Sequence, residues 1–407
     1  MIVGHAGVAQ NGRLNALDVG RGLAIISVIY GHALAPWVLT AGENFNEAAF
    51  LQWKLGAAFM MPFFFFLSGL SWREGKSFAA SARQAFTLIL IALIASAVYD
   101  FARLIASLTG IGPMIGGQTL SIMEYLAGVG RMILIGDYYS LSPLWFIVCL
   151  AVVRLIAALA VRLRPVSAMA LTALVVVLST ASIDLDWRNF YQIKPLGVAF
   201  LFFMAGRLAR SGFHALERTP AAAYALTLIG AAVVALTFHL NEGCRWDAVA
   251  HCGESWLDGR FGVAMIHGQI GNIPFFMLTA LAGIGFASGL AIILARFGGA
   301  VGRKLDAWGG NSLNLVIVNA GFLHVGNVFV EHWIVPNFEP TTPLFFLVLF
   351  AVTLIANIFA AHVLDRPLRR LQRIALTAAR QIVEGACAIP PALAWAQRGD
   401  RVSQRND

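Results

Sequence analysis

Residues 14–40 read LNALDVGRGLAIISVIYGHALAPWVLT, an apolar stretch that carries three ionisable side chains: Asp18, Arg21 and His32. A helix that crosses a bilayer needs about 20 predominantly apolar residues, and this stretch is long enough. Ionisable side chains inside such a helix are costly, so each of the three indicates a functional site by default. Comparable apolar stretches recur through the rest of the chain. The first stretch therefore predicts both the fold class and the place of the chemistry.

Arg21 and His32 are predicted to share one face of this first helix. Eleven residues at about 100° each complete three turns plus about 20°, and they separate the two residues by about 16 Å along the axis. Asp18 precedes Arg21 by three residues and can pair with it on that face. Arginine suits an anion such as phosphate, and neutral histidine suits proton abstraction. The alternative is structural: Arg21 reaches the membrane interface and His32 hydrogen-bonds a neighbouring helix.

The composition of the whole chain also predicts a membrane protein. The chain has 407 residues, of which 59% are hydrophobic and 12% charged, whereas an average soluble domain is about 25% charged. The low content of charged residues excludes a soluble globular enzyme, a disordered chain and a coiled coil. We expect an all-α, polytopic bundle of about ten transmembrane helices, with these approximate bounds: 14–40, 50–70, 84–108, 143–161, 167–183, 193–210, 221–240, 273–296, 311–334 and 343–364.

Basic residues gather on one side of these predicted spans. Of the 29 Lys and Arg residues, 20 fall at the termini or in even-numbered connections, seven on the other side and two within spans. Because basic residues stay cytoplasmic, both termini are predicted to be cytoplasmic, and the net charge of +8 needs no nucleic acid to explain it. We expect an N-terminal segment 1–13, a membrane domain 14–364 and a basic tail 365–407. The tail is expected to begin as a helix on the anionic inner leaflet and to be disordered beyond Pro390.

Several blocks of this sequence match a known family in order along the chain. Residues 15–32 resemble the first-helix signature of the membrane-bound acyltransferase-3 family, in which a basic residue, ten further residues and a histidine follow one another. Later blocks resemble its second, fourth, eighth and ninth helices: 61–69, 144–146, 271–272 with 281–284, and 310–313. The block of the eighth helix has the form of the fucose 4-O-acetylase-like branch. Two positions depart from the pattern: Asn319 stands where the family often has histidine, and Phe86 where it often has a second arginine.

The resemblance implies an integral enzyme of the cell inner membrane. Such an enzyme moves an acyl group, usually acetyl, from cytoplasmic acyl-CoA to a hydroxyl of a cell-surface or lipid-linked carbohydrate. His32 is then the catalytic histidine, and Arg21, oriented by Asp18, lies near the CoA phosphates. We expect acetyl-CoA or another acyl-CoA as the donor, no metal, and the bilayer and a carbohydrate as partners. Further candidates are Arg83 and Arg207 for CoA, and Ser68, Trp145 and Asn319 for the oxyanion or pocket.

Other residues have open interpretations. Ser68-Gly69 also suits a small-residue packing contact, Phe63–Phe66 is expected to face lipid or a packed surface, and Arg154 either faces the crevice or pairs with a carboxylate. The outer connection 241–272 is equally an ordinary loop or an acceptor site that uses Trp246 and Asp258. Zinc binding by this connection is an alternative whose spacing fits no standard site; we expect a Cys244–Cys252 disulfide instead, because this side should be oxidising.

The rival functional class is a secondary transporter. Ten spans, helix-breaking prolines and charge inside the membrane would suit a transporter. However, no pair of interrupted spans occupies corresponding halves of the chain, and few carboxylates lie inside the spans. Dependence on CoA distinguishes the two classes.

Overall fold

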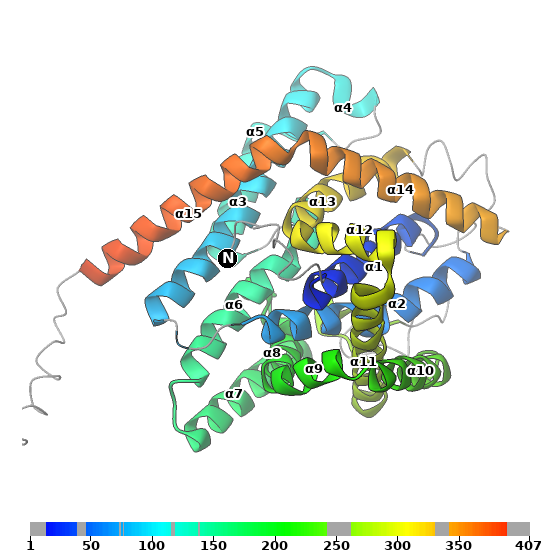
Figure 1. Ribbon diagram of the computed structural model, residues 1–407. Coiled ribbons are helices and arrows are strands. Elements are labelled where there is room, and N and C mark those ends of the chain that lie inside the picture. The colour runs from blue at the N-terminus through cyan, green and yellow to red at the C-terminus, as the bar shows by residue number, and fades with distance from the viewer. Residues whose placement is uncertain are drawn as a thin grey trace, which may run out of the picture.

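The computed structural model describes residues 14–38, 46–72, 75, 77–114, 119–136, 139–241, 262–329 and 342–388. The helices in these ranges are α1 (Ala16–Val38), α2 (Glu47–Leu70), α3 (Phe78–Leu108), α4 (Ile111–Met114), α5 (Ile122–Ile135), η2 (Tyr139–Leu144), α6 (Trp145–Ala160), α7 (Pro165–Asp184), η3 (Phe190–Gln192), α8 (Ile193–Leu208), α9 (Arg210–Arg218), α10 (Pro220–Thr237), η4 (Met265–His267), α11 (Ile273–Phe297), α12 (Gly299–Gly310), α13 (Ser312–Phe329), α14 (Pro343–Val363) and α15 (Asp365–Ala388) (Figure 1).

Seven of the described helices are long and apolar enough to cross a membrane: α1, α2, α3, α7, α10, α11 and α14. The pair Phe190–Leu208 and Arg210–Arg218, bent by 52°, makes an eighth candidate if it is one broken span. Helix α6 and the Ser312–Leu323 part of α13 are apolar but shorter. A helix therefore lies at each segment expected from the sequence, and the chain is a multi-pass helical membrane protein. The count of ten spans and the cytoplasmic termini stay predictions.

Local sequence explains where several of these helices begin. The side chain of Asn46 accepts a hydrogen bond from the Ala49 N–H at the start of α2, and Asn272 caps α11 in the same way. Proline occupies the first turn of α7, α10 and α14, where its missing N–H leaves no helical hydrogen bond unmade. Helix α5 begins with a capping box formed by Ser121 and Glu124.

Helix α1 lies in the interior of the bundle, packed against α2, α11, α12, α13 and α14. Figure 1 shows α14 and α15 crossing one side of the bundle, while α7, α9 and α10 lie on the opposite side. Close approach of α12 to α1 requires glycine, because a Cβ atom at Gly22 would overlap the Leu305 carbonyl oxygen. A Cβ atom at Gly309 would likewise overlap the Asp18 carbonyl oxygen. These glycines fix the first turns of α1 against a neighbouring helix.

The structure decides between the two expectations for the phenylalanine run of α2, and the packed surface is the one confirmed. Phe63–Phe66 are all buried inside the protein, so they do not face lipid. Phe64 and Phe65 pack against Phe146 of α6, and the ring centroids of Phe65 and Phe146 lie 5.0 Å apart. The packing interpretation of Ser68-Gly69 is confirmed for the glycine, because a Cβ atom there would overlap the Phe203 carbonyl oxygen of α8. Large apolar side chains that remain exposed lie on outward helix faces, as on α14, which suits contact with lipid.

The predicted basic helix after residue 364 is present as α15. It packs along α3 and buries Leu368, Ala375 and Ala379, which recur at helical spacing. The Gln372 amide donates a 2.5 Å hydrogen bond to Asn314 of α13. The placement of α15 on an anionic leaflet stays a prediction. The residues beyond Pro390 lie outside the described ranges.

Candidate active site

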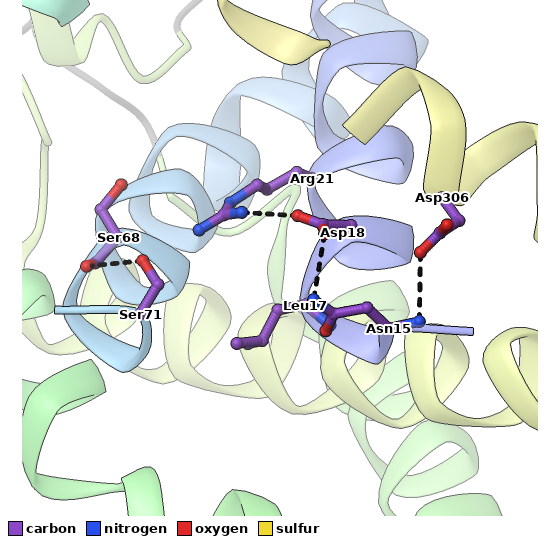
Figure 2. A network of polar contacts seen from close by, with 7 residues as sticks. All are labelled: Asn15, Leu17, Asp18, Arg21, Ser68, Ser71 and Asp306. Atoms are coloured by element: carbon purple, nitrogen blue, oxygen red, sulfur yellow. Dashed lines mark hydrogen bonds and ion pairs between the residues drawn. The ribbon is translucent and has the colours of Figure 1, made fainter. Parts of the chain in front are cut away.

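The first turns of α1 hold the predicted ion pair. A guanidinium nitrogen of Arg21 lies 2.5 Å from Asp18 Oδ1, and both side chains are partly buried. The other carboxylate oxygen of Asp18 accepts a 3.0 Å hydrogen bond from the Asn15 amide. In Figure 2 the Arg21 side chain extends from α1 toward the end of α2 that carries Ser68 and Ser71. Asp18 therefore holds one side of the Arg21 guanidinium, as the three-residue spacing predicted.

A second carboxylate supports this end of α1. The backbone N–H of Asn15 donates a 3.1 Å hydrogen bond to Asp306 of α12 (Figure 2). Burial raises the pKa of the Asp306 carboxyl, the Asn15 hydrogen bond lowers it, and the nearby Asp18 carboxylate raises it further. Asp18 is thus paired with Arg21 directly, and Asp306 is bound to the start of the helix.

His32 lies three turns further along α1 and contacts a chain of amides on other helices. Its Nδ1 atom is 2.5 Å from the Oδ1 atom of Asn319 on α13. The Nδ2 atom of Asn319 donates to Asn357 Oδ1 at 3.3 Å, and the Nδ2 atom of Asn357 donates to the Thr353 carbonyl oxygen at 2.9 Å, both on α14. Asn319 and Asn357 are 1% and 0% exposed, so water does not compete for these groups.

The Thr353 carbonyl gives this chain of hydrogen bonds a single direction. A backbone carbonyl only accepts, so Asn357 must turn its amide nitrogen toward Thr353 and its oxygen toward Asn319. Asn319 must then present its oxygen to His32, and the Nδ1 atom of His32 must be the donor. In the neutral imidazole this leaves Nε2 as the unprotonated nitrogen. The histidine is therefore held in the tautomer that can take a proton at Nε2.

The other candidates occupy different parts of the bundle. Trp145 begins α6 and packs against Phe65, with ring centroids 6.4 Å apart. Ser68 is buried near the end of α2, and its carbonyl accepts a 3.1 Å hydrogen bond from Ser71. Arg83 lies in the first two turns of α3 and Arg207 at the end of α8, both partly buried. The structure brings Asn319 to His32, and no hydrogen bond among the described residues joins Ser68 or Trp145 to His32.

The predicted acceptor site lies outside the part of the chain that the structure describes. Trp246 and Asp258, and the proposed Cys244–Cys252 disulfide, all belong to residues 242–261. These interpretations stay predictions.

A cavity of about 730 Å³ lies beside α1 on a different helix face from His32. It is bounded by α1, α2 and α14, with apolar walls such as Phe346 and Phe350. Its polar groups include Tyr30, whose hydroxyl donates to the Gln52 side chain. The cavity contains neither Arg21 nor His32, so it is separate from the site on the other face of α1.

Two residues were not assigned a role from the sequence: Asn357 was not identified, and Arg154 had two possible roles. Asn357 is the only amide side chain within the predicted last span, and a buried amide in an apolar helix is a usable signal for an interhelical hydrogen bond. On α6, the Nε atom of Arg154 is buried and has no hydrogen-bond partner among the described residues. Of its two possible roles, pairing with a carboxylate is not found among the described residues, where no ion pair includes Arg154.

Comparison with known proteins gives one result. The model of the acyltransferase-3 family, described as an acyltransferase domain, matches residues 14–362, which includes α1 through nearly all of α14. No curated protein and no solved structure matches the chain. The match covers the ion pair, His32 and both asparagines of the amide chain.

Proposed function

Because the chain belongs to the acyltransferase-3 family, we propose that it is an acyl-CoA-dependent O-acyltransferase of the inner membrane. In this proposal it moves an acyl group, acetyl in the simplest case, to a hydroxyl of a cell-surface or lipid-linked carbohydrate. The observation that carries the proposal is the chain of hydrogen bonds from His32 through Asn319 and Asn357 to the Thr353 carbonyl. This chain orients the imidazole for proton abstraction inside a membrane protein. The fucose 4-O-acetylase-like branch belongs to the same proposal.

His32 acts as the general base. Its Nε2 atom takes the proton of the acceptor hydroxyl while that oxygen attacks the thioester carbonyl. When the tetrahedral intermediate collapses, the C–S bond breaks, and the imidazolium returns the proton to the sulfur, so that CoA leaves as the thiol. Asn319 accepts from Nδ1–H and stabilises the imidazolium that forms, so it is a positioning residue. Ser68 and Trp145 remain the candidates for binding the oxyanion or lining the pocket.

Arg21 binds the phosphates of the donor, with Arg83 and Arg207 as further cations for the same group. A guanidinium presents a planar fork of donors that matches phosphate oxygens, and Asp18 fixes its direction from the opposite side. Arg21 and His32 are separated by about 16 Å along α1. An extended donor such as acyl-CoA can span that separation, with its charged end at Arg21 and its thioester near His32.

The test uses membranes that contain the wild-type protein, H32A, or H362A as a matched control. His362 is an exposed histidine in the last turn of α14, so its loss leaves the amide chain intact. Labelled acetyl-CoA is added, and base-labile label is counted in the glycan and glycolipid fraction at equal protein levels. We expect H32A to lose about 10²- to 10⁴-fold in rate and H362A to match the wild type. Equal label with H32A and wild type would remove His32 as the base, and no CoA binding at all would favour a transporter.

A further inference from the structure

The cavity between α1, α2 and α14 is lined by uncharged side chains. Four of them are polar: Ser27 and Tyr30 of α1, Gln52 of α2, and Thr342, which caps α14. The other described residues that line it are apolar, and none of them is Asp, Glu, Lys, Arg or His. Its volume of about 730 Å³ lies in the range of cavities that hold a small molecule. The cavity therefore suits an uncharged ligand that also forms hydrogen bonds.

The pair of Tyr30 and Gln52 is fixed in the wall and keeps unused hydrogen-bonding groups. The Gln52 amide nitrogen donates to the Ala48 carbonyl oxygen at 2.9 Å, so the amide oxygen faces Tyr30 and accepts its hydroxyl. The Tyr30 ring packs edge-on against Phe350, with centroids 5.2 Å apart. Among the described residues, the second N–H of Gln52 and a lone pair of the Tyr30 oxygen have no partner.

Ser27 and Thr342 add one acceptor and one donor. The Ser27 hydroxyl donates to the Leu23 carbonyl oxygen at 3.0 Å, which leaves its own oxygen able to accept. The Thr342 oxygen accepts the Phe345 N–H at 3.3 Å, which leaves its O–H able to donate. The cavity thus offers two donors and two acceptors. A hydroxyl both donates and accepts, so a group with several hydroxyls matches this set, whereas a carboxylate only accepts and an ammonium only donates.

The apolar wall of the cavity continues onto a surface that suits lipid. Leu347 lines the cavity and is 62% exposed, and its neighbours Leu344 and Val348 on α14 are exposed as well. Thr342 caps the start of α14, a membrane-span candidate, so the cavity begins near a membrane–water interface. Phe350 lies about 10 Å deeper along the helix. Polar groups near the interface and an apolar wall open to lipid together match an amphiphile.

We propose that this cavity binds the sugar headgroup of an uncharged glycolipid of the bilayer, with Tyr30, Gln52 and Thr342 as the residues that bind its hydroxyls. The lipid chains leave the cavity over the exposed face of α14. A sugar matches better than a phospholipid headgroup, because no cation among the described lining residues is present to pair with phosphate. Since the cavity contains neither Arg21 nor His32, the inference does not depend on the proposed acyl transfer.

The experiment measures which lipids stay bound when the protein is released from nanodiscs into native mass spectrometry. The discs contain equal amounts of phosphatidylcholine, diacylglycerol and monoglucosyldiacylglycerol with identical acyl chains. We expect the wild type to retain the glucosyl lipid about 10-fold over phosphatidylcholine, with diacylglycerol in between because it has a single hydroxyl. Q52M removes one donor and the partner of Tyr30, and should lower retention of the glucosyl lipid by about 2- to 10-fold. Q84M is the matched control, since Gln84 is a half-buried glutamine of α3 outside the cavity.

A second variant blocks the cavity without touching a buried group. Ala48 is exposed in the first turn of α2 and lines the cavity, so A48F should lower retention of the glucosyl lipid. A221F, at an exposed position in the first turn of α10, should match the wild type. Unchanged retention in folded Q52M or in A48F would overturn the proposal. Equal retention of the glucosyl lipid and phosphatidylcholine would make the cavity a groove for acyl chains, and equal retention of diacylglycerol would make it a site for one hydroxyl. If Q52M fails to fold, A48F decides.

The variant H32A separates this site from the proposed reaction. His32 lies on another face of α1, so H32A should retain the glucosyl lipid as the wild type does. Loss of retention in H32A would place the lipid on the His32 side and overturn the assignment to the cavity. Wild-type protein that retains the glucosyl lipid through Gln52 but transfers no acyl group would contradict only the proposed function.

Discussion

Replacement of Asn319 by leucine removes the acceptor that holds His32 while keeping a similar side-chain volume. The Oδ1 atom of Asn319 is the 2.5 Å partner of His32 Nδ1, and without it the ring loses both its orientation and its preferred tautomer. Loss of one buried hydrogen bond of this kind is worth about 1.5–3 kcal/mol, which corresponds to about 10- to 150-fold in rate. We therefore expect kcat to fall by that factor, and the KM for acetyl-CoA to stay within about twofold, because Asn319 does not contact the donor phosphates.

The matched control is Asn314→Leu. Asn314 lies on the same helix, is 4% exposed, and bonds to Gln372 at 2.5 Å and Asn311 at 2.8 Å without contacting His32. Both variants lose buried hydrogen bonds, so both are expected to lower the melting temperature, but only N319L should lower kcat per folded molecule. The assay is transfer of base-labile label from acetyl-CoA in membranes, normalised to folded protein. Equal loss of kcat in the two variants would refute the positioning role.

The pH dependence of kcat tests the contact between His32 and Asn319 in a second way. N319D keeps an oxygen acceptor at His32 Nδ1 but adds a negative charge that stabilises the imidazolium. The half-maximal point on the acid side of the kcat profile is therefore expected to move to higher pH in N319D. An unmoved profile with normal folding would show that the 2.5 Å contact does not influence the proton carried by His32.

Three further perturbations follow from the packing and the charges. Gly309→Ala places a Cβ atom against the Asp18 carbonyl oxygen and should lower the free energy of unfolding by about 1–3 kcal/mol. At Gly310 a Cβ atom meets open space, so Gly310→Ala is the control. Equal losses of stability in thermal unfolding of the two variants would contradict the close packing at Gly309. Asp18→Asn frees the Arg21 guanidinium and should raise the KM for acetyl-CoA several-fold with kcat nearly unchanged, measured by donor titration. Burial lowers the pKa of His267 to about 4, below the unfolded value of about 6.5, so the unfolded state binds more protons between these values. Stability should fall as pH drops from about 6.5 to about 4, by at most about 1.4 kcal/mol per pH unit, and H267Q should remove that slope in pH-dependent melting.

Features that depend on neighbours along one helix could be predicted from the sequence. The helices at the expected spans follow from apolar stretches of sufficient length and from prolines and capping residues at their ends. The Asp18–Arg21 ion pair follows from a three-residue spacing on a helix. These features need only the period of the α-helix, which is the same wherever the helix lies.

Partners from distant helices could not be predicted in the same way. The contact between His32 and Asn319 joins residues 287 positions apart, and Asn357 adds the link that fixes its direction. The sequence placed Asn319 among the pocket candidates and left Arg154 between two interpretations. Which helix faces meet is set by packing, and a polar residue inside a span indicates only that some partner is needed.

The buried phenylalanine run shows most clearly what cannot be predicted from the sequence. By itself the sequence determined that Phe63–Phe66 lie within an apolar helix, and that Arg21 and His32 share a face of another. It did not determine whether the phenylalanines face lipid or protein, because both surroundings are equally apolar and leave no contrast in hydropathy to read. Only the tertiary structure placed the phenylalanines in the interior, with Phe64 and Phe65 against Phe146 of α6, and joined His32 to Asn319.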